Sequence, residues 1–236
     1  MTREAQKDIE RLKAGEPLDY VIGSVQFLGC KIDLSKGPFI PRPETEYWVE
    51  RVVEEIKYQI SNTKYKIQVL DLFAGSGCVG IAILKHVPHA VLDFVEKSKK
   101  FGEQIKINAE INRIDSKRYR ILQSNVFSNI AGKYDYIFAN PPYIAESRKN
   151  RVQKSVLQWE PKSALFGGKD GLRYIRVLLQ RAQDHLAPGG KLYMEFDSFQ
   201  KNAIAKLLHK FGWEHFAFFR DQYGKWRYAV AEDHKS

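Results

Sequence analysis

The feature that most constrains the fold is a regular alternation of short apolar runs with segments of helical periodicity between residues 67 and 210. The runs are rich in branched and aromatic residues, as buried strands are. Strands that alternate with helices form a parallel sheet with right-handed crossovers and helices on both faces. Two last runs, at 214–219 and 225–231, are joined by a short turn and pair as a hairpin. The sequence therefore predicts an α/β fold with a mostly parallel seven-stranded sheet and one antiparallel strand, preceded by a small β-hairpin at 25–33.

Composition limits the class of protein. The 236 residues are 44% hydrophobic and 13% aromatic, as in a globular chain with a sizeable core. No apolar run reaches the roughly 18 residues that a membrane span needs, and the first residues lack a signal-peptide core. We therefore expect a cytoplasmic protein with no membrane contact. The two cysteines, Cys30 and Cys78, and the histidines have no ligand spacing, so we expect no metal.

The formal net charge of +10 favours acidic partners, nucleic acid included. The excess is concentrated between residues 144 and 182, which contain nine Lys/Arg and three Asp/Glu. This stretch is either a solvated loop and helix face or a basic surface that contacts an acidic partner or RNA.

The segment Asn140-Pro141-Pro142-Tyr143 follows the run at 134–139. Neither proline has an N–H group, so the strand cannot continue its ladder and must turn. Ligands bind at the carboxyl ends of strands in open α/β sheets. A planar group with an NH2 could donate to the Asn140 side-chain oxygen and a proline carbonyl, while its face lies against Tyr143. We expect this corner to bind the substrate.

Residues 75–80 match the pattern G-x-G-x-x-G between a predicted strand and a helix, and Glu96 lies about twenty positions further on. The pattern suits NAD or another nucleoside-like ligand, whose ribose hydroxyls would donate to Glu96. Asp71 favours S-adenosylmethionine, because an anion suits a sulfonium and an ammonium better than a pyrophosphate. The corner at Asn140 has no function in hydride transfer.

Several segments recur together in one known family. The most distinctive are Ile40-Pro41-Arg42-Pro43-Glu44-Thr45-Glu46 and the corner extended to Ile144. Weaker matches are 17–23, 70–77, Glu160-Pro161 with Ala164-Leu165, Asp170-Gly171-Leu172, Pro188-Gly189-Gly190 and Gln200. On these residues the chain resembles the HemK/PrmC protein-(glutamine) methyltransferases, which modify a glutamine in peptide chain release factors.

The resemblance implies a Rossmann-like, class I S-adenosylmethionine-dependent methyltransferase. Its reaction would transfer a methyl group from S-adenosyl-L-methionine to the side-chain amide nitrogen of a glutamine, with a peptide chain release factor as protein substrate. It places the cofactor on Asp71, Phe73, Ala74, Gly75, Ser76, Gly77, Glu96, Asn125, Val126 and Asn140. It assigns substrate binding to Asn140, Pro141, Pro142 and Tyr143, with Asn140, Pro141 and Tyr143 as catalytic residues.

The chain also departs from the family pattern. Phe73 replaces a usual glycine and Asn125 a common acidic residue, so we expect weaker cofactor binding. Asp197 replaces another glycine. The N-terminal helical domain of the family is reduced, and we expect residues 1–36 to form a short helix and hairpin extension and 37–236 the methyltransferase domain.

Three other functions remain open at this point. A nucleic-acid amino-methyltransferase would use the same corner on an adenine or guanine amine, and the net charge suits it. A non-catalytic adaptor would keep the fold without turnover. An NAD oxidoreductase is supported only by the glycine pattern.

Overall fold

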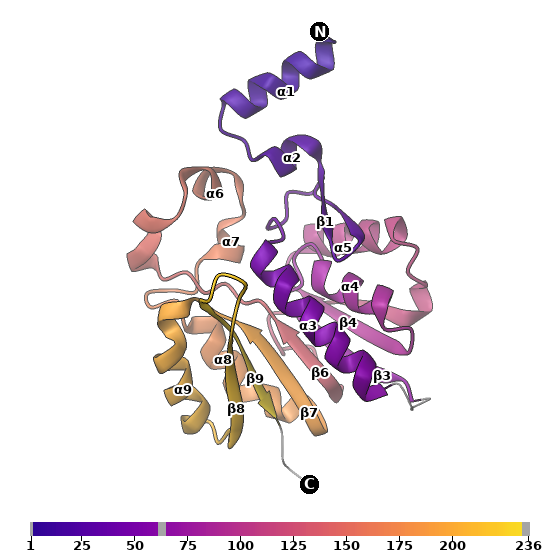
Figure 1. The fold of residues 1–236 in the computed structure, drawn as a ribbon, viewed down its shortest axis with the longest axis vertical. Helices are drawn as coiled ribbons and strands as arrows, with labels where there is room; N and C mark the ends of the chain where they lie inside the picture. Colours follow the sequence, from indigo (N-terminus) through magenta and orange to yellow (C-terminus); the bar gives the residue numbers. More distant parts are fainter. Residues whose placement is uncertain (1, 61–64, 233–236) are drawn as a thin grey trace.

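The computed structural model describes residues 2–60 and 65–232; the outermost positions of the two predicted domain ranges, 1 and 233–236, lie outside the described residues. A seven-stranded sheet forms the centre, in the order β5-β4-β3-β6-β7-β9-β8 (Figure 1). β9 is antiparallel to both of its neighbours, and the other pairs are parallel. The predicted sheet is confirmed. The strands are β3 (Ile67–Leu72), β4 (Ala90–Glu96), β5 (Tyr119–Gln123), β6 (Tyr134–Ala139), β7 (Leu186–Glu195), β8 (His215–Arg220) and β9 (Trp226–Glu232).

Helices cover both faces of this sheet, because successive side chains of a strand point to opposite faces. Val69 packs into one apolar cluster with α3, α4 and α5, whereas Leu70 and Leu72 pack into a second cluster with α8 and α9. The five helices are α3 (Pro43–Ile60), α4 (Cys78–His86), α5 (Lys99–Ile111), α8 (Arg173–Arg181) and α9 (Lys201–Lys210).

The predicted hairpin is present as β1 (Ser24–Phe27) and β2 (Cys30–Asp33). Its side chains Cys30 and Ile32 belong to the first apolar cluster. Asn108 of α5 and Asn112, which caps the carboxyl end of α5, bind its backbone: the Asp33 N–H donates to Asn108 Oδ1 at 2.8 Å, and the Lys31 N–H donates to Asn112 Oδ1 at 3.0 Å. The hairpin is thereby held against the helix layer that flanks β4 and β5.

Helix α1 (Arg3–Lys13) has no buried residue and projects from the body at the top of Figure 1. It is followed by the short α2 (Leu18–Ile22), which the sequence did not predict. The Arg11 guanidinium joins the two, donating to Glu16 Oε1 at 2.6 Å and to the Tyr20 carbonyl at 2.9 Å. No described helix is both long and apolar enough to cross a membrane.

Two details of the predicted C-terminal half are wrong. The sequence of Pro188-Gly189-Gly190 predicts a turn, but these residues lie inside β7, where the register against β6 shifts between Tyr134 and Tyr136. Helical periodicity predicts a helix from 171 to 186, but α8 ends at Arg181 and is followed by a 3₁₀ turn (Ala182–His185). The basic loop also contains short helical turns that have too few residues to show periodicity: Glu146–Arg151, α6 (Lys154–Trp159) and α7 (Lys162–Leu165).

Candidate active site

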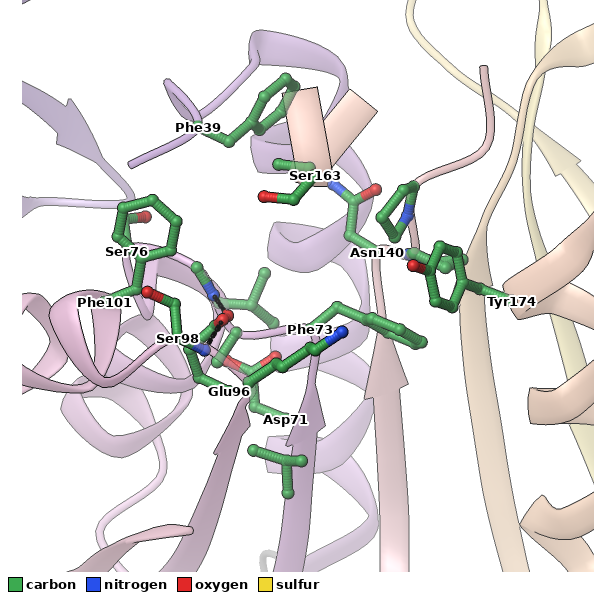
Figure 2. Close-up of a pocket in the computed structure, with 18 of the residues that line it drawn as sticks. Phe39, Asp71, Phe73, Ser76, Glu96, Ser98, Phe101, Asn140, Ser163 and Tyr174 are labelled. Atoms are coloured by element: carbon green, nitrogen blue, oxygen red, sulfur yellow. Dashed lines mark hydrogen bonds between the residues drawn. The ribbon is translucent and has the colours of Figure 1, made fainter. Parts of the chain in front are cut away.

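The carboxyl ends of β3, β4 and β6 open into a cavity of about 410 Å³ (Figure 2). This size is typical of a small-molecule site. Every residue predicted to bind cofactor or substrate lines it, with the exception of Gly77: Asp71, Phe73, Ala74, Gly75, Ser76, Glu96, Asn125, Val126, Asn140, Pro141, Pro142 and Tyr143. Side chains from three separate strand ends therefore face one space.

Asp71 lies in the floor of this cavity and is 3% exposed. Its Oδ2 accepts the Gly80 N–H at 3.0 Å, which satisfies one donor at the start of α4. Burial, assisted by the charge of Glu96, raises the pKa of this carboxyl to about 7, against the opposing effect of the Gly80 hydrogen bond. A cationic ligand in the cavity would favour the ionised form.

Glu96 closes β4 and anchors the glycine loop. Its Oε2 accepts the Gly75 N–H at 3.0 Å, and its Oε1 accepts the Ser98 N–H at 2.8 Å. Burial raises the pKa of Glu96, while these backbone hydrogen bonds oppose the shift. Each carboxylate oxygen has a further lone pair, so Glu96 can hold the loop and still accept from a ligand hydroxyl.

Gly77 does not line the cavity. Its φ is +77°, and a Cβ at this position would lie 3.1 Å from Ile105 Cγ1 and 3.4 Å from Phe94 Cε1. The glycine is therefore required for close packing of the loop against α5 and β4. Local spacing does not distinguish a glycine that faces a ligand from one that faces a helix.

Two non-glycine residues of the cavity wall have left-handed backbone conformations: Phe73 with φ +60° and Val126 with φ +54°. This region is disfavoured for bulky and branched residues, and such outliers concentrate at functional sites. The Phe73 ring meets the Tyr174 ring edge-on, with ring centroids 5.7 Å apart (Figure 2). The side chain that replaces the usual glycine is thus packed against α8.

The Asn140 side chain has no hydrogen-bond partner within residues 2–60 and 65–232. It lines the cavity beside Pro141, and no described residue forms a hydrogen bond with its amide or donates to the Pro141 carbonyl. In Figure 2 the Asn140 amide lies near Ser163, across the cavity from Ser76. The corner at the end of β6 therefore offers two acceptors that no described residue uses, the Asn140 side-chain oxygen and the Pro141 carbonyl oxygen.

Distant segments hold this corner in place. The Gln200 side chain donates to the Tyr143 carbonyl at 3.0 Å, and the Ile144 N–H donates to the Leu165 carbonyl at 2.9 Å. A Cβ on Gly171 would lie only 2.2 Å from the Tyr143 carbonyl oxygen. The family residues beyond the corner thus support its backbone.

The proline-rich segment before α3 forms another wall of the cavity, through Phe39, Pro41 and Arg42. The buried Glu160 carboxylate holds this segment: Oε1 accepts from Arg42 Nη2 at 2.5 Å and Oε2 accepts the Ile40 N–H at 3.1 Å. This segment is the most distinctive match to the family in the sequence, but the sequence did not predict that it lines the cavity.

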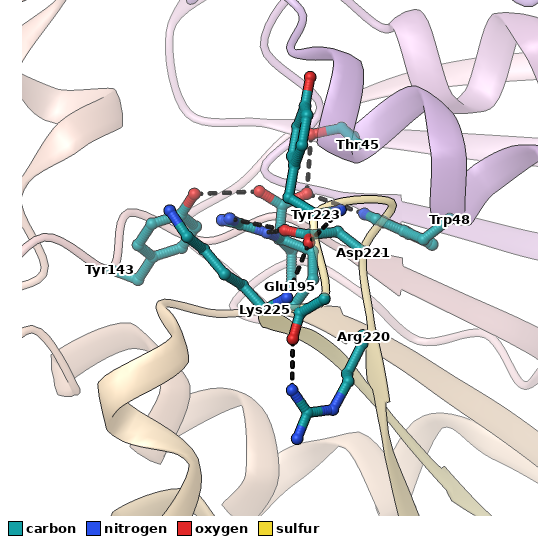
Figure 3. A network of polar contacts seen from close by, with 10 residues as sticks. Thr45, Trp48, Tyr143, Glu195, Arg220, Asp221, Tyr223 and Lys225 are labelled. Atoms are coloured by element: carbon teal, nitrogen blue, oxygen red, sulfur yellow. Dashed lines mark hydrogen bonds and ion pairs between the residues drawn. The ribbon is translucent and has the colours of Figure 1, made fainter.

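Sequence reasoning also missed Glu195, a buried carboxylate at the end of β7. Its Oε1 accepts the Tyr143 hydroxyl at 3.0 Å, as Figure 3 shows. Burial and the charge of Glu195 raise the pKa of Tyr143 well above its ordinary value, so this phenol remains neutral. The sequence does contain a signal for Glu195 as a site residue, because it is an acidic residue at the end of a strand, as Glu96 is. It contains no signal for the contact between Glu195 and Tyr143.

A second cavity, of about 510 Å³, lies on the other side of Tyr143. Phe39, Arg42, Tyr143, Ile144 and Leu165 line both cavities. Cations on the rim of the second cavity come from the basic loop (Arg148, Arg151) and from the turn between β8 and β9 (Lys225). The corner at Tyr143 therefore borders a second cavity whose lining contains neither Asp71 nor Glu96.

Comparison with known proteins agrees with this geometry. The model of the methyltransferase small domain matches residues 53–162. A release factor glutamine methyltransferase from Thermodesulfovibrio yellowstonii is 35% identical over 97% of this chain and 80% of its own length. One from Bacteroides thetaiotaomicron is 33% identical over the same shares. The chain belongs to the release factor glutamine methyltransferase family.

Solved structures of other methyltransferases share the fold of this chain. A methyltransferase from Pyrococcus furiosus has 19% identity and a TM-score of 0.62 over 99% of both chains, a likeness of fold alone. The chain is therefore a class I methyltransferase in architecture. Several segments quoted for the family resemblance meet at the corner at Asn140: Pro41 and Arg42 line the same cavity, and Gln200 donates to the Tyr143 carbonyl. Pro188-Gly189-Gly190 lies instead at the amino end of β7.

Proposed function

We propose that this protein transfers a methyl group from S-adenosylmethionine to the side-chain amide nitrogen of a glutamine, and that its substrate is a peptide chain release factor. The observation that carries the proposal is the Asn140 amide, which has no hydrogen-bond partner among the described residues and lines the same cavity as the buried carboxyl of Asp71 and the partly buried carboxyl of Glu96. Family membership supports both the donor and the substrate.

The residues present fit the methyl donor. When bound, S-adenosylmethionine supplies a methyl group on a positively charged sulfur. Asp71 would attract the cationic part of the ligand, Glu96 would accept from the ribose, and the strained turn at Asn125 and Val126 would border the adenine. Burial of the two carboxyls strengthens these contacts, because the local dielectric is low.

The corner orients the nucleophile. An amide nitrogen is a poor nucleophile, because its lone pair is delocalised into the carbonyl. Donation of its two protons to Asn140 Oδ1 and the Pro141 carbonyl would raise the electron density on nitrogen and fix its orientation. Such positioning supplies roughly 7–11 kcal/mol of a barrier when two reactants are held in line. Tyr143 contributes its ring face, since its hydroxyl proton is committed to Glu195.

A labelling experiment tests the proposal. The protein is incubated with tritium-labelled methyl donor and, separately, with a release factor, with the same factor carrying a Gln→Ala change at the labelled position, and with total RNA. We expect label in the first only. Label in RNA instead would indicate a nucleic-acid amino-methyltransferase. Calorimetric binding of the donor without any transfer would indicate an adaptor.

We predict that affinity for S-adenosylmethionine falls as the pH is lowered through 7. The raised pKa of Asp71, about 7, means that this group takes up a proton there when the cavity is empty. A cationic ligand binds the ionised form, so binding releases that proton below pH 7 and is independent of pH above it. Calorimetry at pH 6 and pH 8 measures the difference. The isosteric Asp71→Asn variant should bind weakly and show no such dependence; an equal pH slope in both would assign the proton to another group.

Glu96→Ala should weaken cofactor binding by about 10- to 100-fold, the cost of losing hydrogen bonds to a charged group. Part of the loss comes from the glycine loop, since Gly75 and Ser98 lose their acceptor. Glu103→Ala is the control, because Glu103 is an exposed carboxylate of α5 that lines neither cavity. Unchanged affinity in Glu96→Ala would place the ribose elsewhere.

We infer that the substrate chain approaches through the second cavity. Arg148, Arg151 and Lys225 have no ion-pair partner in the part of the chain that the structure describes, and Arg148 is held over the Phe199 ring at 3.8 Å. Glu44, Glu195 and Asp197 also line this cavity, but its five arginines and lysines outnumber them, and an excess of cations beside a site raises the association rate of an acidic partner. This basic rim suits an acidic segment of the protein substrate, and the RNA arm of the labelling experiment tests the other partner that it could attract.

A further inference from the structure

The carboxylate of Glu195 joins three parts of the molecule that are far apart in sequence. Its Oε2 accepts the Thr45 hydroxyl at 2.7 Å and the Trp48 indole N–H at 2.8 Å, both from the start of α3. Its Oε1 accepts the Tyr143 hydroxyl at 3.0 Å. In Figure 3, Glu195 lies between the Tyr143 ring on one side and Trp48 on the other. The family segment before α3 is thereby linked to the substrate corner.

This carboxylate is almost inaccessible, with 1% of Glu195 exposed. A buried charge is tolerated only where it is fully hydrogen-bonded or paired. Here all three partners are donors, and the Arg227 guanidinium contributes positive charge nearby while its own ion pair is with Asp221 at 3.0 Å. Burial raises the pKa of Glu195, whereas the hydrogen bonds from Trp48 and Thr45, the charge of Arg227 and the hydrogen bond from Tyr143 oppose this shift. The donors and the nearby guanidinium therefore offset part of the cost of burying the ionised form.

The hydrogen bond to Glu195 also determines how Tyr143 behaves toward a substrate. The phenol ring is attached to the corner by a rotatable bond, and the hydroxyl is its only polar atom. With the hydroxyl proton directed to Glu195, the ring is held in one orientation and cannot donate into the cavity. The corner then offers acceptors and a ring face, which is what an NH2 group requires.

We propose that Glu195 is a positioning residue for methyl transfer, which acts by holding the Tyr143 ring in the orientation that receives the substrate amide. The proposal rests on the proposed function for its kinetic consequence, and on the Glu195–Tyr143 contact alone for its structural consequence. Thr45 and Trp48 both donate to the other oxygen, Oε2, so removal of the Trp48 donor leaves Oε2 with the Thr45 hydrogen bond and Oε1 with the Tyr143 hydrogen bond.

A double-mutant cycle tests it. Glu195→Gln keeps the shape but faces Tyr143 with an NH2 group whenever its oxygen accepts from Thr45 and Trp48. We expect kcat/KM for the release factor to fall by about 10- to 100-fold, the cost of one hydrogen bond to a charged group. In a Tyr143→Phe background the same change should cost only about twofold, within the error of additivity. Affinity for S-adenosylmethionine should remain unchanged in both variants.

Trp48→Phe is the matched control, because it removes a donor from the other carboxylate oxygen and leaves the Tyr143 hydrogen bond in place. We expect a lower Tm with little change in kcat. Equal losses for Glu195→Gln in both backgrounds, or a loss of kcat in Trp48→Phe as large as in Glu195→Gln, would reduce Glu195 to a structural residue and overturn the proposal.

A spectroscopic measurement separates this proposal from the proposed function. In protein labelled with 3-fluorotyrosine, the ¹⁹F resonance of Tyr143 is assigned by its disappearance in Tyr143→Phe. We expect one sharp resonance in the native chain and a shifted or broadened one in Glu195→Gln, without any substrate. If the native chain methylates no release factor but the Tyr143 resonance still changes in Glu195→Gln, the proposed function is refuted and the positioning of the ring by Glu195 is supported. A native chain that is active, with an unaltered resonance and unaltered kcat in Glu195→Gln, refutes the positioning role alone.

Discussion

Asn140→Ala should reduce kcat for release-factor methylation by about 100- to 1,000-fold, the loss that follows when one hydrogen-bonding group aimed at developing charge is removed. The Asn140 side chain has no hydrogen bond to any described residue, so its removal leaves no protein group unsatisfied. The fold should therefore be preserved, and most of the cofactor affinity with it. A tritiated-methyl assay beside a melting curve measures both quantities.

Asn129→Ala is the matched control for this variant. Asn129 is an exposed asparagine outside both cavities, whose amide donates to the Gln123 carbonyl at 3.1 Å. We expect its activity to equal that of the native chain. Full activity in Asn140→Ala would remove this residue from the mechanism and with it the proposed use of the corner.

Gly171→Ala should have the largest effect on stability. The residue has φ +77°, and a Cβ there would lie 2.2 Å from the Tyr143 carbonyl oxygen and 2.6 Å from Gln200 Nε2. Left-handed strain and overpacking against backbone together predict a loss of about 2–5 kcal/mol in the free energy of unfolding. Because the displaced carbonyl belongs to the corner, kcat should fall as well, even at temperatures where the variant is folded. Thermal or urea unfolding and the methyl-transfer assay measure the two effects.

Gly212→Ala is the control that separates the steric clash with the Tyr143 carbonyl from the strain of the left-handed backbone. Gly212 also has φ +77°, but nothing lies within 4 Å of the position its Cβ would take. This variant should lose only about 1–2 kcal/mol, the cost of a left-handed conformation, and should retain activity. If the two variants melted together and were equally active, the packing of residues 167–171 would have no part in holding the corner.

The sequence predicted the chemistry of the main cavity because that chemistry lies at strand ends. Asp71, Glu96 and Asn140 each close or directly follow an apolar run, and the carboxyl ends of parallel strands meet at one edge of a sheet. The local pattern and the handedness of the crossovers are therefore enough to predict that these three residues lie close together. The same reasoning did not reveal that Gly77 faces Ile105, since glycine spacing is the same for a ligand and for a packed helix.

By itself, then, the sequence determined the sheet with its single antiparallel strand, the corner made by two prolines without N–H groups, and the anions at the ends of β3 and β4. Only the tertiary structure decided how that corner is held. The contacts of Glu195 reach 150 residues back to Thr45 and 52 back to Tyr143. Side-chain hydrogen bonds over such separations have no local signature, because they depend on how α3, β6 and β7 pack, and that packing is set by the whole core.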